Sequence, residues 1–89
     1  MTNKKMLIGS LSNDLMRVAS LTQRGSNEAA HTFFVEAKKW AEQLSKYTFK
    51  KYILQIIQDI QTETTLSLEK AETFLMYGIL LQNYSLHLP

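Results

Sequence analysis

The chain contains no cysteine, so neither disulfide bonds nor zinc sites built on thiolates can stabilise it. Its only two histidines, His31 and His87, lie far apart in the sequence and form no metal-ligand pattern. The three glycines are isolated from one another, which excludes the glycine-rich loops that bind phosphates and dinucleotides. No serine stands in the glycine-flanked context of a nucleophile. We therefore expect no metal site, no cofactor and no cofactor-dependent catalysis.

Long apolar runs are also missing. The longest one, residues 74–81, would rise only about 12 Å as a helix, against the roughly 30 Å hydrocarbon core of a bilayer. No repeat or linker divides the chain, and its single proline is Pro89. With 89 residues, of which 45% are hydrophobic, the composition predicts one folded domain over residues 1–89 and a cytoplasmic protein.

Apolar periodicity predicts an all-α fold, a small antiparallel four-helix bundle. The expected helices cover about 4–24, 27–46, 49–61 and 68–85. The first is indicated by apolar residues at steps of three and four, namely Ile8, Leu11, Leu15 and Val18. The third is predicted as a helix rather than a strand because its isoleucines have helical spacing and do not alternate strictly. These residues are Ile53, Ile56, Ile57 and Ile60. Trp40, on the apolar face of the second helix, is expected in the core.

Local signals predict where the helices end. Gly25 is suited to the positive φ that follows a helix end, and Ser26 is suited to the N-cap of the next helix. Thr48 is expected to cap the third helix. Ser67 is expected to cap the fourth, with Leu66 before it as a hydrophobic staple.

The fourth expected helix becomes apolar on every side. Three partner helices in one small bundle cannot cover that much apolar surface. Gly78 in its middle costs about 1 kcal/mol relative to alanine, which indicates that another backbone packs closely there. Met16, off the apolar stripe of the first helix, also suggests contact with another chain. We therefore expect a homo-oligomer, most simply a dimer, with the candidate partner-binding residues Met76, Gly78, Leu80 and Tyr84.

Charge is unevenly distributed along the chain. Residues 1–51 hold nine Lys and Arg against four Asp and Glu, whereas residues 52–89 hold one against four. Basic residues interleaved with aromatic ones form a patch that could bind phosphates while a ring stacks on a base. This candidate nucleic-acid surface comprises Lys38, Lys39, Lys46, Lys50 and Lys51.

Arg24 is followed by His31 with six residues between them, in the order Arg-Gly-Ser-Asn-Glu-Ala-Ala-His. This spacing resembles the Arg-x(4–6)-His signature of HEPN domains, small helical bundles found in RNA-cleaving toxins and beside minimal nucleotidyltransferases. The resemblance covers eight residues and lies early in the chain, whereas the family carries the motif late. It implies that Arg24 binds a phosphate and that His31 exchanges a proton in ribonuclease chemistry across a dimer cleft.

Three functional hypotheses follow from the sequence. The leading one is a non-enzymatic interaction protein that self-associates through its fourth helix and binds another macromolecule. The alternatives are a HEPN-like, RNA-directed subunit that uses Arg24 and His31, and a nucleic-acid binder that uses the basic patch of residues 38–51.

Overall fold

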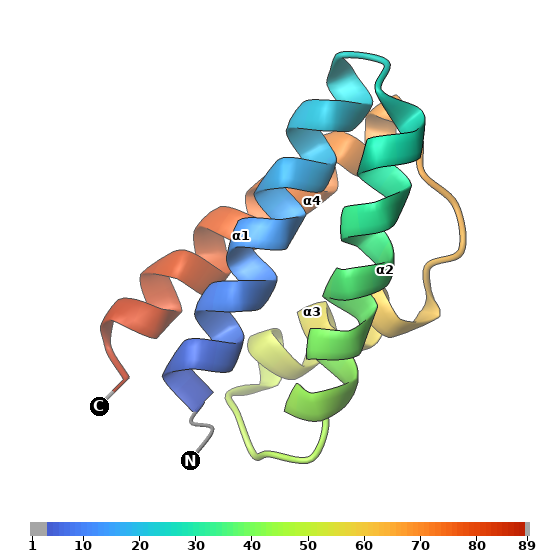
Figure 1. Ribbon diagram of the computed structural model, residues 1–89. Coiled ribbons are helices and arrows are strands. Elements are labelled where there is room, and N and C mark those ends of the chain that lie inside the picture. Colours follow the sequence, from blue (N-terminus) through green and yellow to red (C-terminus); the bar gives the residue numbers. More distant parts are fainter. Residues whose placement is uncertain (1–3, 89) are drawn as a thin grey trace.

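A computed structural model describes residues 4–88, and residues 1–3 and Pro89 lie outside the described residues. The described chain is all-α and forms four helices: α1 (Lys4–Gln23), α2 (Asn27–Leu44), α3 (Lys51–Thr62) and α4 (Leu68–Leu86). The predicted fold class is confirmed. Helix α1 lies in the middle, antiparallel to α2 on one side and to α4 on the other, while the short α3 packs against α2 (Figure 1).

Helix α1 is central because it buries apolar side chains toward two neighbours at once. The predicted stripe of Ile8, Leu11, Leu15 and Val18 is fully buried, and Leu7 and Ala19 widen it. From the facing helices, Phe34 of α2 and Phe74 of α4 meet with their ring centroids 5.6 Å apart. These two rings join the halves of the core that α2 and α4 contribute.

The corner between α1 and α2 is closed by the backbone of Gly25, which has a φ of 79°. The amide of Ser26 donates to the carbonyl of Leu21 and the amide of Gly25 donates to that of Thr22. This pair of bonds is a Schellman motif, which satisfies carbonyls left free at the helix end. Ser26 occupies the N-cap position of α2, but its hydroxyl makes no capping hydrogen bond.

The second connection differs from the prediction. Helix α2 ends at Leu44, where the hydroxyl of Ser45 donates to the carbonyl of Glu42. Helix α3 begins at Lys51, so Thr48 is not its cap, and the N-cap position belongs to Lys50 without a side-chain hydrogen bond. The reason lies in tertiary packing: Phe49 leaves the helical path and buries its ring in the core against Tyr47 and Tyr84.

The third connection follows the prediction more closely. Helix α4 begins at Leu68, and the Ser67 hydroxyl accepts a hydrogen bond of 3.1 Å from the amide of Lys70, as expected of an N-cap. Leu66, the expected staple residue, packs partly buried against the core. The start of α4 is thereby fixed by local chemistry.

Candidate interaction surface

The most unusual surface of the described chain is the outer face of α4. Four large aliphatic side chains there remain well exposed: Leu75 (38%), Met76 (52%), Ile79 (47%) and Leu80 (37%). Together with Glu72 they line a shallow groove of about 300 Å³. Single exposed apolar residues are ordinary on protein surfaces, whereas large contiguous apolar patches are characteristic of interaction sites. We call these four side chains the α4 face.

A second groove begins where the α4 face ends. It lies between α3 and α4, has a volume of about 610 Å³, and includes Tyr52, Ile56, Tyr77 and Leu80 in its lining. Leu80 lines both grooves, so the apolar surface is continuous from one to the other. Tyr84, predicted to bind a partner, is half-buried, and its ring packs edge-on against Tyr52 at a centroid distance of 6.2 Å.

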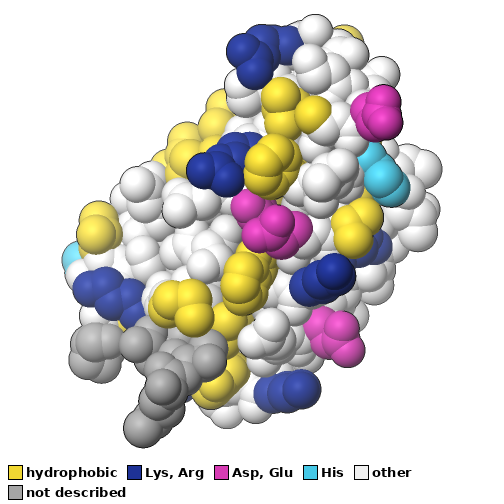
Figure 2. Space-filling model, in the orientation of Figure 1, with side chains coloured by type: hydrophobic (Ala, Val, Ile, Leu, Met, Phe, Trp, Pro, Cys, Tyr) yellow, Lys and Arg dark blue, Asp and Glu magenta, His cyan; other side chains and the backbone are white. Residues whose placement is uncertain are grey.

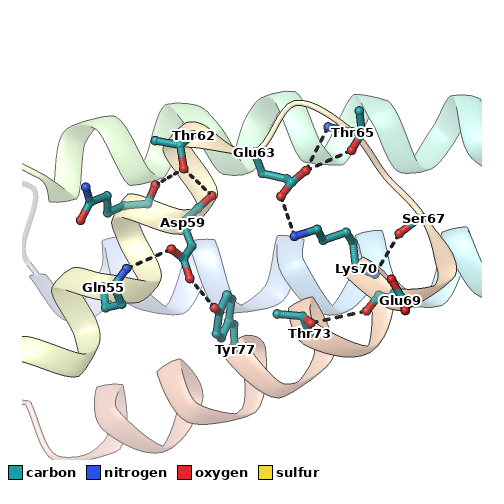
Figure 3. A network of polar contacts seen from close by, with 11 residues as sticks. Gln55, Asp59, Thr62, Glu63, Thr65, Ser67, Glu69, Lys70, Thr73 and Tyr77 are labelled. Atoms are coloured by element: carbon teal, nitrogen blue, oxygen red, sulfur yellow. Dashed lines mark hydrogen bonds and ion pairs between the residues drawn. The ribbon is translucent and has the colours of Figure 1, made fainter.

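Polar contacts hold α3 and the following loop against α4 (Figure 3). The Asp59 carboxylate accepts hydrogen bonds from the Tyr77 hydroxyl at 2.5 Å and from the Gln55 amide at 3.0 Å. Burial raises the pKa of the Tyr77 hydroxyl to about 12, and the Asp59 carboxylate adds to the rise. An ion pair of 2.9 Å joins Glu63 to Lys70, and the hydrogen bond from Lys70 lowers the pKa of Glu63. Tyr77 is thus anchored and forms a fixed wall of the groove.

The prediction that a backbone packs closely on Gly78 is confirmed, but the backbone is that of α1 in the same chain. A Cβ at Gly78 would stand 2.8 Å from Cγ of Met16 and 3.2 Å from the carbonyl oxygen of Ser12. The Ser12 hydroxyl donates a hydrogen bond of 2.6 Å to the Gly78 carbonyl. Gly78 is therefore buried and does not belong to the exposed face. Met16, off the apolar stripe of α1, lies beside Gly78 of α4 in the same chain and is half-buried.

The basic patch is only partly available to a ligand. Lys39, Lys46, Lys50 and Lys51 are exposed. Lys38 donates to the carbonyl of Gln61 at 3.2 Å, and its ammonium lies 5.1 Å from the centroid of the Phe34 ring. In the view of Figure 2 the charged side chains gather mainly over α2, while the flank formed by α4 is largely white and yellow. The basic patch nevertheless reaches α4 at one end, because Lys51 lines the groove between α3 and α4 together with Leu80 of the α4 face.

Arg24 and His31 are both exposed, on either side of the corner between α1 and α2. An open hollow at this corner is lined by residues 25–29 and by Thr32. Neither Arg24 nor His31 belongs to that lining. The hollow at this corner therefore does not bring the two side chains together.

A buried acidic site between α1 and α2 was not predicted. The Asp14 carboxylate is buried and accepts a hydrogen bond of 3.0 Å from the Trp40 indole, which is half-buried rather than fully in the core. Burial and the neighbouring Glu36 carboxylate together raise the pKa of Asp14 to about 6, against the opposing effects of the Trp40 hydrogen bond and of Arg17. A sequence signal existed, because Asp14 continues the helical spacing of Leu7 and Leu11 in a core position.

No group of three or more potential metal ligands comes together among residues 4–88, and none of the helices described is long and apolar enough to cross a membrane. Comparison of the chain with protein-family models, with curated proteins and with solved structures found no match.

Proposed function

We propose that this chain is a non-enzymatic interaction protein that self-associates as a dimer through the α4 face and binds a further macromolecule. The observation that carries the proposal is the contiguous exposure of Leu75, Met76, Ile79 and Leu80 on one helix. Burying apolar surface releases about 25 cal/mol per Å² of area removed from water, so a row of exposed aliphatic side chains favours association.

The charges around the α4 face also support association with another protein. No Asp, Glu, Lys or Arg occurs from Thr73 to Leu88, so the centre of the α4 face has no ion of its own helix to desolvate, and Glu72 is the charged residue of α4 at the edge of this groove. Protein interfaces typically have such an uncharged centre surrounded by a polar rim. Glu69, Lys70 and Glu72 provide charge only at the first turns of the helix.

Solution mass tests this proposal. We would measure it by light scattering over a range of protein concentrations for the wild type, for Ile79→Glu and for Val35→Glu. Val35 is the matched control, because it is also β-branched and almost equally exposed (41% against 47%) but lies on α2. We expect a dimer for the wild type and Val35→Glu and a monomer for Ile79→Glu, at unchanged helix content. A wild type that stays monomeric at the highest concentration would overturn the proposal.

The same measurement separates the two nucleic-acid hypotheses from the leading one. Adding a short RNA over a salt series leaves the mass unchanged if the α4 face alone drives assembly. An RNA complex that weakens steeply with salt would favour the exposed lysines, because phosphate contacts release counterions. Variants Lys50→Ala and Arg24→Ala in that complex would then distinguish the basic patch from the HEPN-like pair.

A further inference from the structure

The outermost side of α4 carries a stripe of six exposed residues spaced four, three, four, three and four positions apart. We call it the α4 stripe: Leu68, Glu72, Leu75, Ile79, Gln82 and Leu86. It begins and ends with the terminal residues of the helix, Leu68 and Leu86, which are 67% and 68% exposed. Alternating steps of three and four are the spacing of a coiled-coil seam, in which such residues contact a second helix.

The chemistry of this stripe reads the same in both directions. From the N-terminal end it runs aliphatic, polar, aliphatic, and from the C-terminal end it again runs aliphatic, polar, aliphatic. Its centre lies at the level of Tyr77. A helix turned end for end about a two-fold axis at that level meets its own copy in matched layers: Leu68 with Leu86, Glu72 with Gln82, and Leu75 with Ile79.

We infer that α4 pairs antiparallel with α4 of a second copy of this chain, and that Glu72 and Gln82 set the register. The inference rests on the proposed function, since it specifies how the self-association through the α4 face is built. Two identical Leu75–Ile79 layers form the centre of the interface, because a two-fold axis repeats every contact. Met76 and Leu80 add apolar surface beside them.

Polar complementarity fixes the direction. In the antiparallel register the side-chain N–H of Gln82 donates to the Glu72 carboxylate of the other copy, once on each side of the axis. In a parallel, in-register pair the two Glu72 carboxylates would face each other, and like charges at an interface are destabilising. Glu72 is the only charged member of the stripe, so it alone decides between the two arrangements.

Cysteine cross-linking tests the register without background, because the chain has no cysteine of its own. We would oxidise Glu72→Cys alone, Gln82→Cys alone, and an equimolar mixture in which one variant carries a mass tag. The antiparallel register predicts a mixed disulfide in the mixture and little cross-linking of either variant alone. Homodimeric disulfides in both single variants would overturn the inference while leaving the proposed dimer intact. A monomeric mass with no cross-link would overturn both.

Charge exchange provides an independent readout. Gln82→Glu places two carboxylates opposite each other and should weaken the dimer roughly tenfold. Adding Glu72→Lys should restore the affinity, because lysine and glutamate then face each other across the interface. Both positions are exposed within one chain, so folding should be unchanged by circular dichroism. A double variant as weak as Gln82→Glu, or a single variant as tight as the wild type, would overturn the antiparallel register.

Discussion

The contact between Gly78 and α1 allows a quantitative test of the fold. We would replace Gly78 by alanine, with Gly9→Ala as the control. Both glycines lie inside helices, where alanine is intrinsically favoured by about 1 kcal/mol. Around Gly9 nothing lies within 4 Å of the added Cβ, whereas at Gly78 it would approach Met16 Cγ to 2.8 Å and the Ser12 carbonyl oxygen to 3.2 Å.

The two substitutions should therefore change stability in opposite directions. Overfilling a packed site costs about 1–3 kcal/mol, and moving the helices apart to relieve it stretches the hydrogen bond of 2.6 Å from Ser12 to Gly78. We expect Gly78→Ala to lose up to about 2 kcal/mol after its gain in propensity, a fall in Tm of up to about 15 °C. We expect Gly9→Ala to gain about 0.5–1 kcal/mol.

Urea unfolding followed by circular dichroism measures both values, at one protein concentration for all variants because association shifts apparent stability. Met16→Ala provides a further check, since it removes the nearest obstructing atoms. The cost of Gly78→Ala should be smaller in that background. A Gly78→Ala variant as stable as Gly9→Ala would refute the close approach of α4 to α1.

Two predictions concern ionisation. The pKa of Asp14 is raised from 3.8 to about 6 in the folded chain, so the folded state binds more protons between these values and stability falls as pH rises through this window. Asp14→Asn should remove this slope. Between pH 4 and pH 7, the unfolding free energy of the variant should rise relative to that of the wild type by about 1–2 kcal/mol, which is less than the full pKa shift gives because solvent screens the exposed Glu36. Parallel pH profiles of the two proteins would contradict the burial of Asp14. In an alkaline titration followed by ultraviolet absorbance, Tyr77 should ionise near pH 12, above the ordinary range of tyrosine, and Tyr77→Phe should abolish that late step. A Tyr77→Phe titration identical to that of the wild type would contradict the Asp59 contact.

The features that sequence reasoning predicted well are those fixed by local chemistry. Gly25 ends α1 because it adopts a positive φ, and Ser67 caps α4 because its hydroxyl reaches the amide of Lys70. The isoleucines of α3 are buried where their spacing placed them. Such signals need no knowledge of the rest of the chain.

The errors arose where distant parts of the chain decide the outcome. Thr48 has the chemistry of a cap, but the burial of Phe49 delays α3 to Lys51. Gly78 indicated that another backbone packs closely, but a single glycine does not identify that backbone. In the structure it is α1 of the same chain. Asp14 was overlooked as a core residue because an acid at a core position is understood only with its partner, Trp40, in view.

The central place of α1 has a consequence for biosynthesis. Its neighbour α2 follows it directly in the chain, whereas the contact between Ser12 and Gly78 joins residues 66 positions apart. Closing such a long loop is slower than forming a local hairpin. We expect α1 and α2 to form an early pair as the chain leaves the ribosome, with the side of α1 that later receives α4 still uncovered. Until the ribosome releases α4, we expect that side of the nascent chain to expose apolar surface of the kind that chaperones shield.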